Sequence, residues 1–156
     1  MLKYVNHDIV FQEFPDEVTL AINLSLCPNG CPGCHSAFLQ GDVGEELTDE
    51  RLLGMVGDYR NEVTCVGFMG GDNDPCRVAQ LAHLVKETFN GEIKTGWYSG
   101  RQNPSEAFDS SAFDYVKFGP YIAARGPLKS PSTNQRLFKY KADGSREDIT
   151  QRFWRK

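Results

Sequence analysis

The sequence lacks long hydrophobic runs, an excess of basic residues, internal repeats and low-complexity tracts. No apolar stretch reaches the roughly 20 residues of a membrane-spanning helix, so we expect a soluble protein without a membrane partner. The 17 lysine and arginine residues are outnumbered by 21 aspartate and glutamate residues, which argues against a nucleic-acid partner because such proteins present clustered basic residues. Residues Met1 to Asp8 lack the apolar segment of a secretory signal peptide, so we expect a cytoplasmic protein with reduced thiols.

The sequence does contain enough apolar material for one folded domain. Its 156 residues match the length of a single domain, 1–156, and 40% of them are hydrophobic and 12% aromatic. Five cysteines are also present. In a chain that keeps its thiols reduced, clustered cysteines indicate metal binding or catalysis more often than disulfides.

Three of the cysteines form the pattern Cys-x3-Cys-x2-Cys: Cys27, Cys31 and Cys34, followed directly by His35. Three thiolates can hold a [4Fe–4S] cluster and leave its fourth iron without a protein ligand. An open metal position can bind a substrate or cofactor, whereas a closed one is structural. The triplet therefore predicts an iron–sulfur site with one reactive iron.

Four other interpretations of the triplet are open at this point. A structural disulfide leaves one of three clustered thiols unpaired, and a redox pair formed by the last two cysteines leaves the first unexplained. Zinc could take His35 as a fourth ligand, although tetrahedral zinc usually draws its ligands from two separated pairs. A closed cluster could take Cys65 or Cys76 as its fourth ligand, but no spacing demands it.

Alternating strand and helix patterns lie on both sides of the triplet. Apolar and β-branched runs predict strands, and apolar residues at helical spacing predict helices with one buried face. Thr48 is expected to cap one helix and Asp74, before Pro75, another. The expected strands are one or two within 4–14, then 18–24, 63–69, 93–98, 115–118 and a last one at 137–141; the expected helices are 49–60, 75–89 and 104–108, and 41–47 is expected to be a loop. The tail with Phe153 and Trp154 either packs back or frays.

Strands that alternate with helices indicate β–α units and a mainly parallel sheet. Ligands of such sheets bind at the carboxyl ends of the strands. The triplet follows the strand expected at 18–24, and Gly70-Gly71-Asp72 follows the strand expected at 63–69, so both motifs should open on the same edge. A full barrel of eight units needs about 250 residues, so the sequence predicts an α/β fold with an incomplete parallel β/α barrel. The open side of such a barrel suits a macromolecular substrate.

Several motifs together resemble those of a known family. The cysteine triplet is similar to that of radical S-adenosylmethionine enzymes. The run Cys31-Pro32-Gly33-Cys34 and the run Met69-Gly70-Gly71-Asp72 resemble the activating enzyme of anaerobic ribonucleotide reductase. Residues 114–121 and 132–136 resemble its C-terminal blocks, so the likeness covers most of the chain.

The resemblance implies a partial barrel of the radical S-adenosylmethionine type, in which S-adenosylmethionine binds the open iron of a [4Fe–4S] cluster held by Cys27, Cys31 and Cys34. An electron, for which a flavodoxin-like protein is the expected donor, then cleaves a carbon–sulfur bond to give methionine and a 5′-deoxyadenosyl radical. In this family the radical removes a hydrogen atom from a glycine of the anaerobic ribonucleotide reductase large subunit. The resemblance assigns cofactor binding to Gly33, Cys34, His35, Gly70, Gly71 and Asp72.

Physical chemistry suggests how these residues would act. Glycine at positions 33, 70 and 71 lets the backbone approach a ligand closely. Asp72 could accept a charge-assisted hydrogen bond from the ammonium group of the cofactor, or Gly70-Gly71-Asp72 is a simple strand-exit turn. His35 stands where the family commonly has tyrosine, and it either packs against the adenine or faces solvent.

One departure from the family lies beside this turn. The family usually has proline directly after Gly-Gly-Asp, whereas Asn73 and Asp74 intervene here before Pro75. The insertion could shift the start of the following helix and with it the contact made by Asp72.

The remaining cysteines and two aromatic residues have open roles. Cys65 alternates along an expected strand and is expected to be a small buried hydrophobe. Cys76 is expected to be structural rather than reactive, although it lies in the first turn of a helix, where a thiol pKa can be lowered. Trp97 and Tyr98 either line the site or fill the core.

Two other functions fit the same sequence. One is another small radical S-adenosylmethionine activase or synthase; the short chain argues against a small-molecule substrate, whose site usually needs more chain to close. The other is a zinc or iron–sulfur binding module without catalysis. The colour of the protein purified without air distinguishes the last of these, because a thiolate-held iron–sulfur cluster absorbs visible light and zinc does not.

Overall fold

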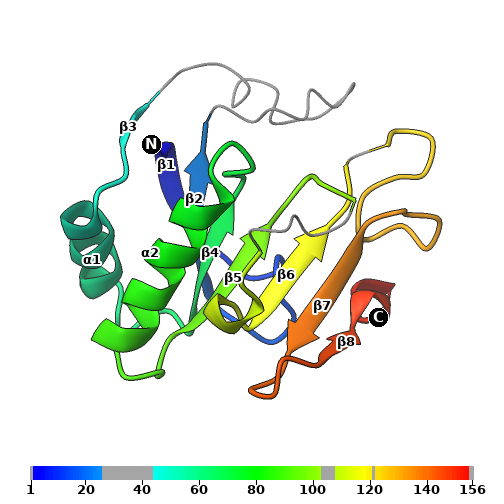
Figure 1. Cartoon of the computed structure of the whole chain (residues 1–156). Coiled ribbons are helices and arrows are strands. Elements are labelled where there is room, and N and C mark those ends of the chain that lie inside the picture. The colour runs from blue at the N-terminus through cyan, green and yellow to red at the C-terminus, as the bar shows by residue number, and fades with distance from the viewer. Residues whose placement is uncertain (1, 26–43, 103–107, 121, 155–156) are drawn as a thin grey trace.

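The structure, a computed structural model, describes residues 2–25, 44–102, 108–120 and 122–154. In these residues the chain forms one eight-stranded sheet and two α-helices, an α/β fold (Figure 1). The strands are β1 (Lys3–Val10), β2 (Thr19–Leu24), β3 (Glu45–Glu46), β4 (Cys65–Met69), β5 (Lys94–Tyr98), β6 (Tyr115–Phe118), β7 (Arg136–Tyr140) and β8 (Arg146–Asp148). The helices are α1 (Asp49–Asp58) and α2 (Pro75–Thr88), with short 3-10 helices η2 (Ser110–Ala112) and η3 (Thr150–Trp154).

The sheet is parallel only at its centre. Its strand order is β3-β1-β2-β4-β5-β6-β7-β8, and the neighbours among β2, β4, β5 and β6 run parallel. The outer strands β1, β3, β7 and β8 all pair antiparallel. The expectation of a mainly parallel sheet is therefore wrong at both sides. The connection between β7 and β8 spans only 141–145, which is too short for the crossover that parallel strands need.

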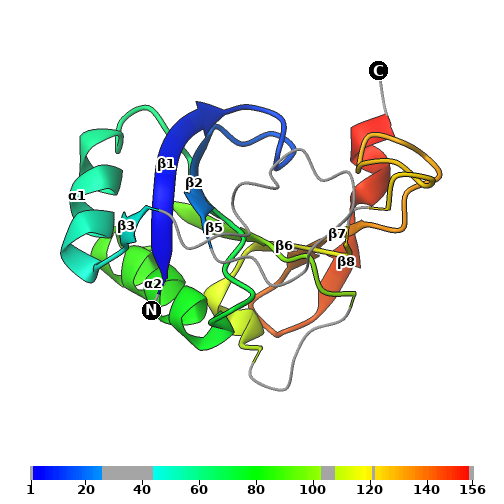
Figure 2. The ribbon, with the colours of Figure 1, turned by 90° about the horizontal axis from the view of Figure 1, so that it is seen from above.

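Both α-helices lie on the same side of the sheet (Figures 1 and 2). α1 begins after Thr48, whose side-chain oxygen accepts a hydrogen bond from the backbone of Arg51 at 3.1 Å. α2 begins at Pro75 after the cap Asp74, whose carboxylate accepts from the backbone of Arg77 at 3.3 Å. Each cap satisfies a backbone donor that the first turn of a helix leaves without a partner. Both starts match the sequence prediction.

Alternation of side chains along the strands gives the sheet two different faces. The face against the helices is covered by the larger core, to which the strands contribute Leu20, Ile22, Leu24, Val66, Phe68, Trp97, Val116 and Phe118. On the other face, Phe14 is fully buried and packs with Cys65, Tyr115 and Leu137; we call this side the Phe14 face. A side chain at Gly96 would overlap the ring of Phe14, so this strand position requires glycine.

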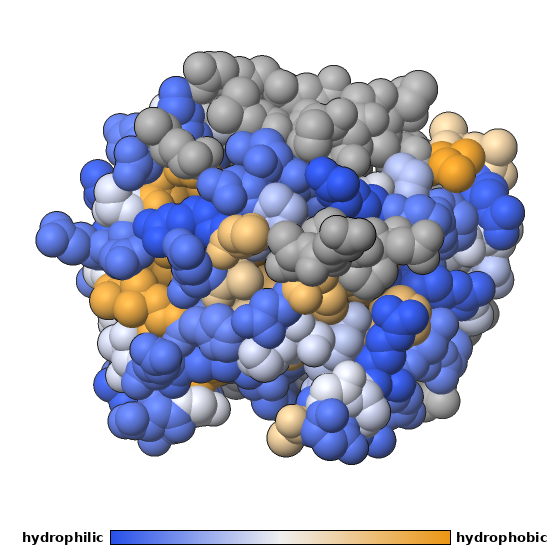
Figure 3. Space-filling view, viewed as in Figure 1, coloured by the Kyte–Doolittle hydropathy of each residue, from blue (hydrophilic) through white to orange (hydrophobic). Residues whose placement is uncertain are grey.

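The side of the molecule seen in Figure 1 is largely hydrophilic, with separate apolar patches (Figure 3). In the described part of the chain, neither helix has the length and apolar character needed to cross a membrane.

Most expected elements are confirmed, and the differences lie at the outer strands. The expected strand within 4–14 is a single strand that ends at Val10, and Phe11 beyond it is 68% exposed. The strand β7 is not the last one, because β8 follows it, and β3 lies within the expected loop 41–47. The expected helix 104–108 falls almost wholly outside the described residues. The tail packs back, with Phe153 against the Phe14 cluster and the indole N–H of Trp154 donating to the carbonyl of Leu128 at 2.9 Å.

Candidate functional site

The strands that precede the two motifs, β2 and β4, are neighbours and end at the same edge of the sheet, as the sequence predicts. β2 and β4 are parallel neighbours in which Asn23 lies opposite Met69. β2 leads to Ser25, two residues before the first cysteine of the triplet, and β4 leads directly to Gly70. We call this side of the sheet the carboxyl edge. The predicted site residues Cys27, Cys31, Gly33, Cys34 and His35 lie outside the described residues, so their roles stay predictions.

Both ends of the segment that contains the triplet are fastened to the start of β1. The backbone N–H of Ser25 donates to the carbonyl of Lys3 at 3.0 Å, and the N–H of Leu47 donates to the carbonyl of Leu2 at 2.8 Å. Between these bonds, Glu46 of β3 pairs with Lys3. The chain therefore enters and leaves this segment beside Leu2 and Lys3, at the start of β1.

Gly70 and Gly71 form the turn that follows β4. Their φ angles are +107° and +94°, a region that residues with a side chain rarely adopt. Space also requires glycine, because a Cβ atom on Gly70 would lie 3.2 Å from the carbonyl oxygen of Leu24 and one on Gly71 would lie 2.6 Å from Cγ2 of Val78. The indole N–H of Trp97 donates to the carbonyl of Gly70 at 2.6 Å. The turn thus packs against the end of β2, the strand that leads to the triplet.

Asp72 is buried, with 1% of its surface exposed, and the fold itself supplies partners for its carboxylate. Oδ1 accepts a hydrogen bond from the hydroxyl of Ser99 at 2.5 Å, and Oδ2 accepts one from the backbone N–H of Gly100 at 2.8 Å. The guanidinium of Arg101 donates to the carbonyl oxygen of Asp72 at 3.1 Å. These contacts join the exit of β4 to the exit of β5. The sequence did not reveal Ser99 and Arg101 as members of the site, because nothing local in the chain links them to Asp72.

The two residues inserted after Gly-Gly-Asp complete a turn and a helix cap. The N–H of Asp74 donates to the carbonyl of Gly71 at 3.0 Å, and Asp74 then caps α2. The helix begins at Pro75, as the sequence predicts. Cys76 lies exposed in the first turn of α2, at the same end of the fold as the glycine turn.

Lys117 is a second charged residue that sequence reasoning missed. It belongs to β6, on the Phe14 face, and only 7% of its surface is exposed. Its ammonium donates to the carbonyl of Gly119 at 3.1 Å and lies 5.3 Å from the centre of the Tyr98 ring. The available signal was a lysine inside an otherwise apolar strand of four residues.

Trp97 and Tyr98, whose roles the sequence left open, both pack in the interior. Trp97 lies on the helix side, 3% exposed, with its ring stacked 5.5 Å from that of Phe113. Tyr98 lies on the Phe14 face, where its ring meets that of Phe14 edge-on at 5.2 Å and its hydroxyl donates to the carbonyl of Glu13.

Cys65 lies at the opposite end of the parallel strands from the carboxyl edge. It is the first residue of β4 and pairs with Thr19, the first residue of β2. Since β4 spans about 13 Å from its first to its last residue, Cys65 is far from the carboxyl edge. Burial, reinforced by the nearby Glu17 carboxylate, raises the pKa of the Cys65 thiol. The placement agrees with a small buried hydrophobe and argues against Cys65 as a fourth metal ligand.

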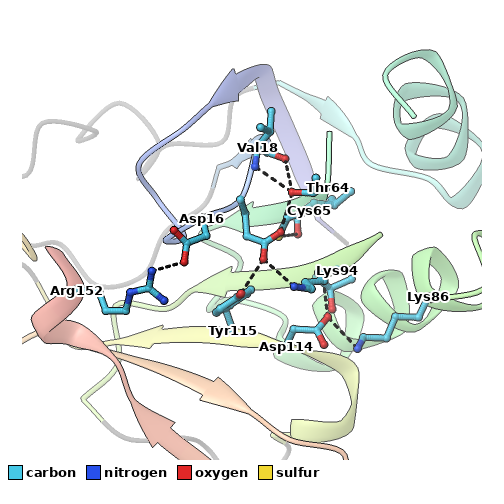
Figure 4. A network of polar contacts seen from close by, with 12 residues as sticks. Asp16, Val18, Thr64, Cys65, Lys86, Lys94, Asp114, Tyr115 and Arg152 are labelled. Atoms are coloured by element: carbon cyan, nitrogen blue, oxygen red, sulfur yellow. Dashed lines mark hydrogen bonds and ion pairs between the residues drawn. The ribbon is translucent and has the colours of Figure 1, made fainter. Parts of the chain in front are cut away.

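A second buried carboxylate lies at this opposite end, which we call the amino edge. Glu17 is 7% exposed and accepts hydrogen bonds from Thr64 at 2.7 Å, Lys94 at 2.9 Å and Tyr115 at 2.8 Å. Figure 4 shows these three side chains converging from the starts of three neighbouring strands. They fix the chain between β1 and β2, and with it Phe14, against the sheet.

The charges at the amino edge are coupled. Burial opposes ionisation of Glu17, but the hydrogen bonds from Thr64, Lys94 and Tyr115 and the Lys94 charge outweigh it, so the pKa of Glu17 is lowered. The hydrogen bond to Glu17 in turn raises the pKa of Lys94. Burial, followed by the bond to Glu17, raises the pKa of Tyr115. At neutral pH the cluster therefore holds a carboxylate, an ammonium and a neutral phenol.

Within the described residues, no three side chains of histidine, cysteine, aspartate or glutamate lie together as a metal site. One feature of the carboxyl edge fits an iron–sulfur cluster with bound S-adenosylmethionine. The glycine turn packs against Leu24 at the end of β2, the strand that precedes the three cysteines. No family model matches the chain, and neither a curated protein nor a solved structure matches it.

Proposed function

We propose that this protein is a radical S-adenosylmethionine enzyme that activates anaerobic ribonucleotide reductase. Cys27, Cys31 and Cys34 would hold a [4Fe–4S] cluster, and the Gly70–Gly71 turn would contact S-adenosylmethionine. The protein substrate would be the large subunit of the reductase, and a flavodoxin-like protein would supply the electron. The fold would be an incomplete barrel of the radical S-adenosylmethionine type.

One observation supports this proposal most strongly. The strand that precedes the cysteine triplet and the strand that leads to the Gly-Gly-Asp turn are neighbours and parallel, so both strands end at the carboxyl edge. Neither motif requires the other, and the carboxyl ends of parallel strands are where sheets of this kind bind ligands. The close packing of the glycine turn against Leu24, at the end of β2, also supports a site that both motifs share.

The shape of the sheet is consistent with an incomplete barrel. Seen from above, its strands follow a curved path from β1 to β8 (Figure 2). Both helices cover the outer side of this curve, and Phe14 fills the inner side near the amino edge. A ligand site at the carboxyl edge would therefore have a packed floor beneath it.

The chemistry of the proposed reaction belongs mainly to the cofactor. When bound, a cluster held by Cys27, Cys31 and Cys34 together with S-adenosylmethionine would supply one-electron radical chemistry that ends with removal of a hydrogen atom from the substrate glycine. The residues of the chain bind and orient. The thiols would supply deprotonated ligands, and the absence of side chains at Gly70 and Gly71 would let the ligand approach the backbone of the turn closely.

The test begins with the protein purified and reconstituted without air. We expect a brown protein with a broad absorbance band at about 400 nm. After addition of dithionite and S-adenosylmethionine, the mixture should contain 5′-deoxyadenosine. Mixed with the reductase large subunit, it should give the paramagnetic resonance doublet of a glycine-centred radical. A colourless protein that holds zinc would refute the proposal, and so would a cluster with every iron bound by side chains.

A further inference from the structure

Asp72 and Ser99 fasten together the exits of two neighbouring strands at the carboxyl edge. We propose that they are positioning residues, which hold the Gly70–Gly71 turn in the shape that binds S-adenosylmethionine. In this arrangement Asp72 acts through Ser99 and Gly100, and the binding energy does not depend on a direct contact of its charge with the ligand. The inference rests on the proposed function and deepens it.

Four hydrogen bonds form this clamp, which consists of Asp72, Ser99, Gly100 and Arg101. The carboxylate of Asp72 accepts from the Ser99 hydroxyl at 2.5 Å and from the Gly100 N–H at 2.8 Å. The backbone N–H of Arg101 donates to the Ser99 oxygen at 3.2 Å, and its guanidinium donates to the Asp72 carbonyl at 3.1 Å. Ser99 is fully buried and Asp72 nearly so, which makes the bond between their side chains stronger than it would be in water.

The clamp also reaches the next strand. The backbone N–H of Ser99 donates to the carbonyl of Lys117 at 2.8 Å, and the N–H of Gly119 donates to the carbonyl of Arg101 at 2.6 Å. The exits of β4, β5 and β6 are therefore held in one hydrogen-bonded unit. The glycine turn lies at one side of that unit and the buried lysine at the other.

A turn of two consecutive glycines needs such support. Glycine loses more conformational freedom on ordering than any other residue, so a loose Gly70–Gly71 turn would have to be ordered when the ligand binds. Order supplied in advance by the fold lowers that cost and strengthens binding. The short bond from the Ser99 hydroxyl to a charged oxygen is well suited to this task, because charge-assisted hydrogen bonds are the stronger ones.

Two substitutions separate positioning from direct contact. In Asp72→Asn the charge is lost, but the amide oxygen can still accept from Gly100 and the amide nitrogen can donate to the Ser99 oxygen. In Ser99→Ala the charge is kept, but the bond between the two strand exits is lost. A positioning role predicts that Ser99→Ala does the greater damage, whereas a charged contact with the ligand ammonium predicts the reverse.

Ser111→Ala is the matched control. Its hydroxyl donates to the carboxylate of Asp109 at 2.5 Å, the same bond as in the clamp, but the pair is exposed and lies beside η2. Loss of this bond removes a similar contact without touching the carboxyl edge. The control should leave the binding of S-adenosylmethionine unchanged.

Calorimetric titration of the reconstituted protein with S-adenosylmethionine gives the deciding measurement. We expect Ser99→Ala to weaken binding about tenfold or more and Asp72→Asn to weaken it about threefold, with KM changed more than kcat in the cleavage reaction. Stronger weakening by Asp72→Asn than by Ser99→Ala would overturn the inference while leaving the proposed function intact. A wild-type protein that binds no S-adenosylmethionine would instead overturn the proposed function.

Hydrogen exchange provides a readout that needs no cofactor. The Gly100 amide, which donates to Asp72, should exchange faster in Ser99→Ala than in wild type or in Ser111→Ala, because its acceptor is no longer held. Unchanged protection of Gly100 in Ser99→Ala would show that the clamp does not hold the strand exits together, and the inference would fail on that result alone.

Discussion

The two edges of the parallel strands each bury one carboxylate, and they surround it differently. At the amino edge, Glu17 is held by side chains, among them the ammonium of Lys94, and Phe14 fills the space beside it. At the carboxyl edge, Asp72 is held by a hydroxyl and a backbone N–H next to two consecutive glycines. The first arrangement closes one end of the sheet with large side chains. The second is built mainly from backbone groups, because the Gly70 N–H donates to the carbonyl of Tyr98 and the Gly71 carbonyl accepts from the N–H of Asp74.

The largest expected effect separates the cysteines of the two edges. Cys27→Ala, Cys31→Ala or Cys34→Ala should each abolish cleavage of S-adenosylmethionine, because each would remove a ligand of the cluster. Cys65→Ala, at the amino edge, should keep that activity and cost only about 1 kcal/mol of stability. Chromatographic measurement of the 5′-deoxyadenosine formed by each variant checks this difference. Loss of cluster colour in Cys65→Ala would mean that Cys65 is a ligand after all.

The next effect tests the packing of the amino edge. Phe14→Ala should lower the free energy of unfolding by about 3–5 kcal/mol, since it empties the space that a fully buried ring occupies. Urea unfolding measures this loss. Phe11→Ala is the control, because Phe11 is exposed and its removal should change stability by no more than about 0.5 kcal/mol. Equal effects of the two substitutions would contradict the placement of Phe14.

A smaller effect tests the close approach of Phe14 to the sheet. Gly96→Ala should destabilise the protein by about 1–3 kcal/mol, because the added methyl group overlaps a ring that Tyr98 and Tyr115 hold in place. Gly54→Ala, in α1 with no atom near the new methyl group, should instead stabilise it by about 0.5–1 kcal/mol. Thermal unfolding of both variants checks the difference in sign.

The smallest effect concerns the charge at the amino edge. Glu17→Gln should cost about 1–2 kcal/mol at neutral pH, since it weakens the hydrogen bonds from Thr64, Lys94 and Tyr115. Because the fold lowers the pKa of Glu17, its contribution is present above the ordinary carboxyl pKa and is lost as the pH falls below it. Urea unfolding across this pH range should therefore show that the difference in free energy of unfolding between wild type and variant becomes smaller on acidification. A gap that widens at low pH would contradict the lowered pKa.

Local signals in the sequence predicted much of the fold. Thr48 and Asp74 cap their helices as expected, and the strand at 115–118 has the expected limits. These features depend on a few adjacent residues, so a sequence pattern can identify them. The strands β3 and β8 were missed because they are two and three residues long and consist of exposed charged residues. Such short strands form only because a neighbour offers an unpaired edge.

The buried polar clusters could not be predicted in the same way. Glu17 meets Lys94 and Tyr115, which are 77 and 98 positions away in the chain. Asp72 meets Ser99 across 27 positions. The sequence predicted correctly that the strands before the two motifs end at one edge, since that follows from their parallel direction. It did not reveal which residues hold the glycine turn in place, because those contacts depend on how the strand exits fold back on one another.

The bonds from Ser25 to Lys3 and from Leu47 to Leu2 have a practical consequence for handling the protein. Because both bonds end on Leu2 and Lys3, the entropic cost of holding Ser25 and Leu47 close together is reduced only while these two residues stay in place. Deleting the first four residues, or crowding them with a bulky affinity tag, would release Ser25 and Leu47 at once. Loss of the proposed cluster from such a fusion would then report on the release of Ser25 and Leu47 rather than on the cysteines, and a tag at the other terminus avoids the ambiguity.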